Sequence, residues 1–193
     1  MKELKQNRLM LAGILVFSAM TMIGLVDNLI KYIGEDGSVW QFHFSRSVII
    51  CIVLLIFSRI YKLQLRPNNF FFVAIRSFFG ATAMIMYFGA LSVIPIAEAG
   101  AGLFTAPIFV LIISSFYFKV KIGIWRILAV VIGFSGVLLM LQPDTNNLSY
   151  FSFLPLFAGF FYGMLGLSTR YLCPNESTEV LTLGFFVALG VYG

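Results

Sequence analysis

Residues 97–118 read "AEAGAGLFTAPIFVLIISSFYF", and this stretch sets the class of the protein. Glu98 is its single charged residue, and the remainder is apolar, small or weakly polar. A helix of about 20 such residues is long enough to cross a hydrocarbon core of about 30 Å. The stretch is therefore expected to be a transmembrane helix.

The rest of the chain has the same character. Hydrophobic residues make up 60% and charged residues 11%, whereas soluble domains carry about 25% charged residues. Further apolar runs of spanning length lie at residues 9–33, 38–58, 69–91, 122–141 and 150–169. A run that begins near residue 180 has about 14 residues, about 21 Å at helical rise, which is too short to span. The sequence predicts an all-α integral membrane bundle with six full spans and part of a seventh.

Basic residues gather at every second helix end, which predicts the orientation, because Lys and Arg are retained on the cytoplasmic side. The basic ends hold Lys2, Lys5, Arg8, Arg59, Lys62, Arg66, Arg76, Lys119, Lys121, Arg126 and Arg170. The opposite ends hold Glu35, Asp36, Glu98 and Asp144. We expect residues 1–8 to be cytoplasmic in a bacterial inner membrane. The net charge of +5 then reflects topology and not nucleic-acid binding.

A short internal similarity predicts a repeat. The stretch "GLVDNLIKYI" from Gly24 aligns with "GMLGLSTRYL" from Gly163, and Lys31 meets Arg170 at the same offset of 139 (163 − 24 = 170 − 31). A repeat of five helices places the second copy upside down in the membrane, as in many transporters that hold substrate near the midplane. Chance similarity between two helix ends is the alternative.

Two longer stretches resemble a known family. "FGALSVIPIAEAGAGLFTAPIFVLIISSFYF" from Phe88 and "KIGIWRILAVVIGFSGVLLMLQP" from Lys121 are similar to the third to fifth helices of the EamA repeat in the drug/metabolite transporter superfamily. Arg46, after "WQFHFS", resembles an arginine of that family's second helix. The resemblance implies a complete repeat at 9–141 and the start of a second at 150–193. It also implies transport of a small metabolite or drug.

The chain departs from the family pattern in two places. Many members carry an acidic residue at the end of their fourth helix, where this chain has Phe118 and Lys119. Members with two repeats have ten helices, and the last three are absent from this sequence. A role for that acidic residue is therefore not expected here.

Charged and polar residues within the first two runs form the first candidate site. Asp27 lies about 9 Å below the outer end of its run and Arg46 about 12 Å below the outer end of the next, so the two share a depth. An unpaired carboxylate in hydrocarbon costs several kcal/mol, which favours an ion pair of Asp27 with Arg46 or with Lys31. With Asn28, these groups either face a polar cavity or ion path, or only order the two helices.

Two titratable groups are candidates for proton coupling. His43 lies one turn before Arg46 on the same helix face, and Glu98 lies at the start of residues 97–118. Either would titrate near neutral pH if suitably buried. The alternatives are an interfacial hydrogen bond for His43 and favourable placement at a helix N-terminus for Glu98.

Pro107 and several small residues predict how the helices pack around a substrate. Pro107 lacks an N–H and so leaves a backbone carbonyl free, and loosened helices are where transporters place their sites. A kink that only shapes packing is the alternative. Gly159 and Gly163 form a small-xxx-small packing face. Tyr87 and Tyr162 are expected to line the cavity.

Enzyme chemistry is not predicted. The stretch "GFSG" at residues 133–136 has the form of an intramembrane serine protease motif, but the only histidine, His43, lies near the outer end of another run. We therefore expect Gly133 and Gly136 to serve packing. No metal cluster or phosphate-binding loop is found, so no catalytic residue, metal or cofactor is predicted. Cys51 and Cys173 would lie at different depths and are not expected to form a disulfide.

The predicted function is a multi-pass carrier that works by alternating access, with proton coupling or exchange as the candidate energy source. Its expected partners are the lipid bilayer, a small-molecule substrate and a second copy in a homodimer. The alternative is a non-transporting membrane scaffold or subunit, such as the remnant of a carrier.

Overall fold

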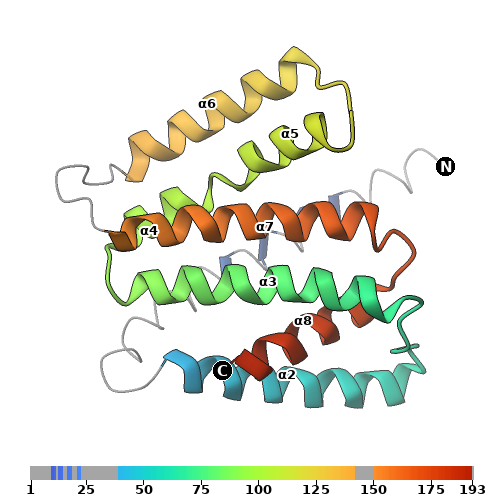
Figure 1. Ribbon diagram of the computed structural model, residues 1–193. Helices are drawn as coiled ribbons and strands as arrows, with labels where there is room; N and C mark the ends of the chain where they lie inside the picture. The colour runs from blue at the N-terminus through green and yellow to red at the C-terminus, as the bar shows by residue number, and fades with distance from the viewer. Residues whose placement is uncertain are drawn as a thin grey trace. The chain divides into compact units, whose positions relative to one another are not determined.

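The computed structural model describes residues 39–141 and 150–192, together with eight helical positions between residues 10 and 22 (Figure 1). The chain divides into two units, Met1–Val39 and Trp40–Gly193. In the first unit, the hydroxyls of Ser18 and Thr21 each donate a hydrogen bond of 2.9 Å to the carbonyl oxygen four residues earlier, as in a helix. Asp27, Asn28 and Lys31 lie outside the described residues.

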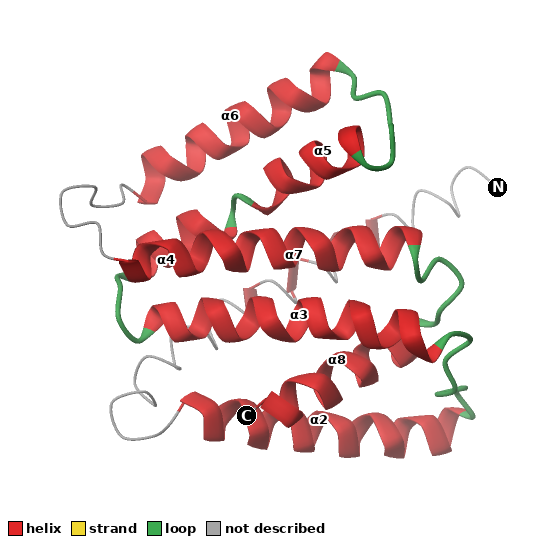
Figure 2. Cartoon of the chain, viewed as in Figure 1, coloured by secondary structure: helices red, strands yellow, loops and turns green. Residues whose placement is uncertain are grey.

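All regular structure in the described ranges is helical (Figure 2). From residue 39 onward the elements are α2 (Val39–Tyr61), α3 (Phe70–Leu91), α4 (Ile96–Leu103), α5 (Ala106–Phe116), α6 (Ile124–Leu141), the 3₁₀ helix η1 (Tyr150–Phe153), α7 (Leu154–Tyr171) and α8 (Thr178–Tyr192). Three segments are long and apolar enough to cross a membrane: Trp40–Tyr61, Phe70–Leu91 and Ile96–Phe116. Ile124–Leu139 and Thr178–Tyr192 are apolar but shorter. The all-helical class is confirmed, whereas six full spans and an inverted repeat stay predictions.

The stretch at 97–118 forms two helices, with a break at Phe104 and Thr105 between α4 and α5. Pro107 lies in the first turn of α5. It cannot donate the backbone hydrogen bond that would continue α4. The Thr105 hydroxyl donates a 2.6 Å hydrogen bond to the Gly102 carbonyl oxygen. The predicted interruption is therefore confirmed, and a side chain satisfies one carbonyl at the break.

Helices α3 and α7 lie side by side in the middle of the second unit (Figure 1). Helix α7 also packs on α4 and α5, and α3 also packs on α8. Helix α6 lies beyond α5 and makes few contacts with it, while α2 lies on the opposite side of the α3–α7 pair. The bundle therefore has a tightly packed centre, made of α3, α4, α5 and α7.

Glycine allows α7 to approach the break between α4 and α5. A Cβ added at Gly159 would collide with the Thr105 hydroxyl and would lie 2.6 Å from the Gly102 carbonyl oxygen. A Cβ at Gly163 would lie 3.2 Å from the Ala106 carbonyl oxygen. The small-xxx-small packing face predicted on α7 is therefore confirmed.

The packing role expected for Gly133 and Gly136 on α6 is wrong for the described part of the chain. Both residues are exposed, and a Cβ added at either would meet no atom within 4 Å. The reason is that α6 touches its neighbours only lightly, so this face of the helix has no packing partner there.

The loops that carry the basic residues lie at one end of the bundle (Figure 2). They are the loops at residues 62–69 and 117–123, and the loop at residues 172–177, which follows Arg170 of α7, lies at the same end. The Phe118 and Tyr171 rings stack with centroids 3.8 Å apart, which places the second loop against the end of α7. Asn68 Nδ2 donates a 2.9 Å hydrogen bond to the Asn175 carbonyl oxygen, which joins the first loop to the third. This arrangement agrees with the charge pattern of the sequence.

A carboxylate from the loop before α8 caps the N-terminus of α3. Glu176 accepts hydrogen bonds from the backbone N–H of Asn68 (3.1 Å) and of Asn69 (2.8 Å). The Asn69 side chain in turn accepts from the N–H groups of Phe71 and Phe72. These bonds satisfy donors that the first turn of a helix leaves unpaired, and a negative charge there is favourable.

Gly159→Ala is expected to lower the free energy of unfolding by about 1–3 kcal/mol, because the added methyl group would collide at the α4–α5 break. Gly166→Ala on the same helix is the matched control, because a Cβ there meets nothing within 4 Å. That control should leave stability unchanged or slightly raised, since alanine is the better helix former. Thermal unfolding in detergent measures both. Equal melting temperatures for the two variants would contradict the packing described here.

Candidate functional site

A pocket of about 660 Å³ lies beside the break between α4 and α5. We call it the α4–α7 pocket. Its lining residues are Leu103, Phe104, Ala106, Pro107, Val110, Leu111, Arg126, Ala129, Val130, Tyr162, Gly163 and Gly166. Its volume is within the range of about 300–1,000 Å³ that is usual for small-molecule sites. Pro107 and Tyr162, two residues predicted to lie at the site, are thus brought together.

The helices position two polar groups in this otherwise apolar pocket. Among the described lining residues, Arg126 is the only charged one and Tyr162 the only one with a side-chain hydroxyl. Tyr162 precedes Gly163, whose close contact with the Ala106 carbonyl holds this turn of α7 against α5. Arg126 is in the first turn of α6. An apolar wall with a phenol and a guanidinium can hold a flat organic molecule that carries hydrogen-bond acceptors.

Arg126 is a pocket residue that the sequence analysis missed. Its charge was interpreted only as part of the basic cytoplasmic end. The available signal was its position inside the apolar run 122–141, where a charged side chain is rare and functional by default.

A second polar group lies on α2. His43 is only 1% exposed, and its ring packs edge-on against Phe88 of α3 with centroids 4.5 Å apart. Arg46 Nη2 lies 3.4 Å from His43 Nδ1. A guanidinium can only donate, so Nδ1 accepts and the proton of the neutral ring is on Nε2. That N–H has no hydrogen-bond partner among the described residues.

Aromatic rings surround the Arg46 guanidinium. Its Cζ atom lies 5.5 Å from the centroid of Phe42 and 5.8 Å from that of Phe186 on α8, within the range of cation–π attraction. Ser47, one position further along α2, is also buried, and its hydroxyl has no partner among the described residues. The structure therefore brings His43 and Arg46 together, and it adds Ser47, which the sequence analysis did not name.

Two further predicted residues, Tyr87 and Glu98, line neither described pocket. Tyr87 packs on a buried cluster of Ala90, Ile94 and Ala99 and lines neither described pocket. Glu98 is half-buried in the first turn of α4. The predicted pairing of Asp27 with Arg46 stays a prediction, because Asp27 is outside the described residues.

Arg76 joins three helices near the basic end of the bundle. From α3, its Nε donates a 3.1 Å hydrogen bond to the Thr169 hydroxyl on α7, and its Nη1 donates a 2.7 Å bond to the Leu181 carbonyl oxygen on α8. The sequence analysis did not identify this bridge, because both partners lie more than 90 positions away in the chain.

Cys173 lies beside this bridge, in the loop after α7. It is 3% exposed and packs with Val73, Val180 and Leu181. Burial raises the pKa of its thiol, Glu176 adds to this effect, and Arg76 opposes it. The thiol is therefore neutral near pH 7 and packs as a small apolar side chain. Cys51 and Cys173 are both free, so the prediction of no disulfide between them is confirmed.

The serine protease motif does not form a catalytic pair. Ser135 is exposed on α6, whereas His43 is buried on α2, and α3 and α7 lie between these helices (Figure 1). A histidine base would have to be within hydrogen-bonding distance of the serine.

In comparisons with known proteins, the chain matches one family of transporters and several proteins that are named as transporters. A model of the EamA-like transporter family matches residues 10–142. A riboflavin transporter of Vibrio cholerae is 28% identical over 121 residues, which is 62% of this chain and 41% of that protein. An S-adenosylmethionine uptake transporter of Rickettsia prowazekii is 29% identical over 167 residues, which is 84% of this chain and 55% of that protein.

A third relative covers more of the chain. An uncharacterized transporter of Helicobacter pylori is 23% identical over 192 residues, which is 97% of this chain and 64% of that protein. The chain thus spans less than two thirds of the length of each of these relatives. No solved structure matches.

Arg76→Lys is expected to lower the free energy of unfolding by about 1–3 kcal/mol, because one ammonium cannot reproduce the two divergent hydrogen bonds to α7 and α8. The loosened loop should also let maleimide reach Cys173 faster, as measured by mass spectrometry. Arg59→Lys, at an exposed position in the last turn of α2, is the control and should change neither quantity. The bridge would be refuted if the two variants behaved alike.

Proposed function

Since the chain belongs to the EamA-like transporter family, we propose that it carries a small metabolite across a bacterial inner membrane by alternating access. Membrane residence and a transporter-type fold are properties of the family, and two of the relatives are named for the transport of riboflavin and of S-adenosylmethionine. The observation that carries the proposal is the α4–α7 pocket, which lies beside a broken helix.

The proposed topology places the N-terminus in the cytoplasm, with six full spans and part of a seventh. Loops 62–69 and 117–123 carry basic residues, Arg170 of α7 precedes loop 172–177, and the three loops lie at one end of the bundle, as the positive-inside rule requires of cytoplasmic loops. In the proposed arrangement, α7 and α8 begin a second repeat that is inverted relative to the first.

Substrate binds in the α4–α7 pocket in this proposal. Phe104 and Tyr162 offer aromatic surfaces, and Arg126 offers donors to a carbonyl or carboxylate oxygen of the substrate. Riboflavin and S-adenosylmethionine both carry a flat heteroaromatic ring, which suits stacking on such a surface. A ring-bearing, partly polar metabolite is therefore the substrate class that we infer.

The break between α4 and α5 supplies the moving part of the mechanism. Two short helices can tilt relative to each other with less loss of hydrogen bonding than a continuous helix would suffer, because the Thr105 hydroxyl already satisfies the Gly102 carbonyl. Pro107 lines the pocket at this position, so a change of tilt would alter the pocket directly. The mechanism is a rocking of α4 and α5 against α7 around bound substrate.

Arg126→Gln and Tyr162→Ala are each expected to weaken uptake of riboflavin or of a related ring-bearing metabolite into proteoliposomes by about tenfold or more. The reason is the loss of a charged hydrogen bond and of an aromatic contact, respectively. Arg170→Gln is the matched control, because it removes a basic residue at the same end of the bundle but outside the pocket. If the wild-type protein takes up the substrate and neither the Arg126 nor the Tyr162 variant changes that uptake, the proposed site is refuted. Absence of saturable binding and uptake would instead favour the membrane scaffold.

Proton coupling is the proposed energy source, with Glu98 and Asp27 as candidate carriers. An inwardly directed proton gradient should raise the initial uptake rate of the wild-type protein. Glu98→Gln or Asp27→Asn should abolish that increase and leave counterflow exchange intact, because a fixed neutral side chain cannot carry a proton. The measurement is uptake with and without an imposed pH difference. A wild-type rate that does not respond to the gradient would exclude this coupling and leave exchange.

A further inference from the structure

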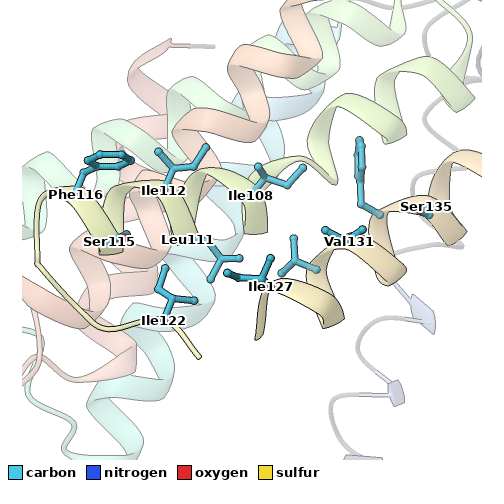
Figure 3. A pocket seen from close by; sticks show the side chains of 11 residues that line it. Ile108, Leu111, Ile112, Ser115, Phe116, Ile122, Ile127, Val131 and Ser135 are labelled. Atoms are coloured by element: carbon cyan, nitrogen blue, oxygen red, sulfur yellow. The ribbon is translucent and has the colours of Figure 1, made fainter. Parts of the chain in front are cut away.

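The space between α5 and α6 is an apolar groove with a volume of about 390 Å³ (Figure 3). We call it the α5–α6 groove. Ile108 of α5 and Val131 of α6 line one part of it, and Phe116 lies at the end near the loop between the two helices. Apart from two serines, every described lining residue is aliphatic or aromatic. The two serine hydroxyls are thus the only polar side-chain groups among the described lining residues, and the groove suits an apolar occupant.

The length of the groove matches one leaflet of a bilayer. Along α6 its lining extends from Ile127 to Ser135, eight residue steps or about 12 Å at helical rise. Half of a hydrocarbon core of about 30 Å is about 15 Å. A groove of this length beside a membrane-spanning helix can take one acyl chain.

A cationic surface borders the end of the groove at the loop between α5 and α6. Lys119 and Lys121 are exposed in this loop, and the stack of Phe118 on Tyr171 holds the loop against α7. Arg170 adds a third positive charge, with its Cζ atom 5.6 Å from the Tyr171 ring. Residues 99–141 include no Asp or Glu. The charge here therefore has no compensation from its own segment.

Trp125 gives the depth of this loop in the membrane. It follows the loop directly and is 80% exposed. Exposed tryptophans of membrane proteins are enriched where hydrocarbon meets the headgroups. The loop lysines would then lie at the level of the headgroups, and the groove would extend from there into the hydrocarbon.

We propose that the α5–α6 groove binds an acyl chain of an anionic phospholipid whose headgroup lies on Lys119 and Lys121. The apolar groove accommodates the acyl chain. The positive charge at its mouth, which no Asp or Glu of residues 99–141 offsets, favours a headgroup with net negative charge over a zwitterionic one. Each basic side chain near an anionic lipid surface favours binding by about 1 kcal/mol. The proposal depends on residence in a membrane and not on the transport activity.

The experiment uses quenching of Trp125 fluorescence by lipids with brominated acyl chains. The chain has two tryptophans, so Trp40→Phe leaves Trp125 as the only one. This parent protein is placed in phosphatidylcholine vesicles that contain increasing fractions of brominated phosphatidylglycerol, or of brominated phosphatidylcholine for comparison. Half-maximal quenching is expected at a fraction of phosphatidylglycerol at least about fivefold lower than that of phosphatidylcholine.

Two pairs of substitutions separate a specific site from general charge attraction. Lys119→Gln with Lys121→Gln should abolish the preference for phosphatidylglycerol. Lys62→Gln with Arg66→Gln removes the same charge from the loop between α2 and α3 and should leave the preference intact. Equal quenching of the parent by both lipids, or equal loss in both double variants, would overturn the proposal.

A third change tests the groove itself. Val131→Phe with Ser135→Phe fills the space between α5 and α6, so quenching at low lipid fraction should fall although both lysines remain. Unchanged quenching would place the lipid outside the groove and overturn the proposal. Absence of quenching in the parent, together with cross-linking between copies through α6, would show a second protein copy in the groove and would also overturn it. Thermal unfolding of each variant confirms that it is folded.

Discussion

The close contact of Gly159 with the break between α4 and α5 is the interaction on which the rest of the structure depends. In hydrocarbon, backbone groups that a helix break releases must be satisfied by protein. The Thr105 hydroxyl donates a hydrogen bond to the Gly102 carbonyl oxygen. Helix α7 covers both groups because Gly159, which lies against them, has no side chain. This contact sets the distance between α7 and α5, and so the position of the pocket between them. A broken helix is tolerated here because another helix seals it.

At the basic end of the bundle, hydrogen bonds between polar groups hold the apolar helices in register, in place of close contact between small residues. Arg76 links α3 to both α7 and α8, and Glu176 caps α3 from the loop between them. If α7 and α8 begin an inverted repeat, these bonds couple the two repeats at the basic end of the bundle. The alternating-access motion would then involve α4, α5 and α6 more than α3, because α3 is fixed by directional bonds whereas α6 touches its neighbours only lightly.

Three regions of the described chain differ in polarity, and two of them have a proposed role. The α4–α7 pocket combines apolar walls with the donors of Tyr162 and Arg126, which suits recognition of a substrate. The polar face of α2 holds a neutral His43 beside Arg46 within aromatic rings, where a buried donor lacks a described partner. The α5–α6 groove is apolar with cationic residues at its mouth, which suits lipid. The two proposed roles follow from which polar and apolar side chains the helices bring together in each region.

The sequence by itself determined the membrane class, the positions of the helices from residue 39 onward in the described ranges to within a few residues, the interruption at Pro107 and the packing role of Gly159. It did so because transfer of a segment into hydrocarbon, and the lack of an N–H or a Cβ, are properties of single segments or residues. Only the tertiary structure decided that Arg126 shares a pocket with Pro107 and Tyr162, and that Arg76 bridges three helices. These are relations between side chains far apart in the sequence, and which helix faces meet depends on the fit of both surfaces. For the same reason Gly133 lacks the expected packing partner among the described residues, since a small residue permits a close contact but does not supply the partner.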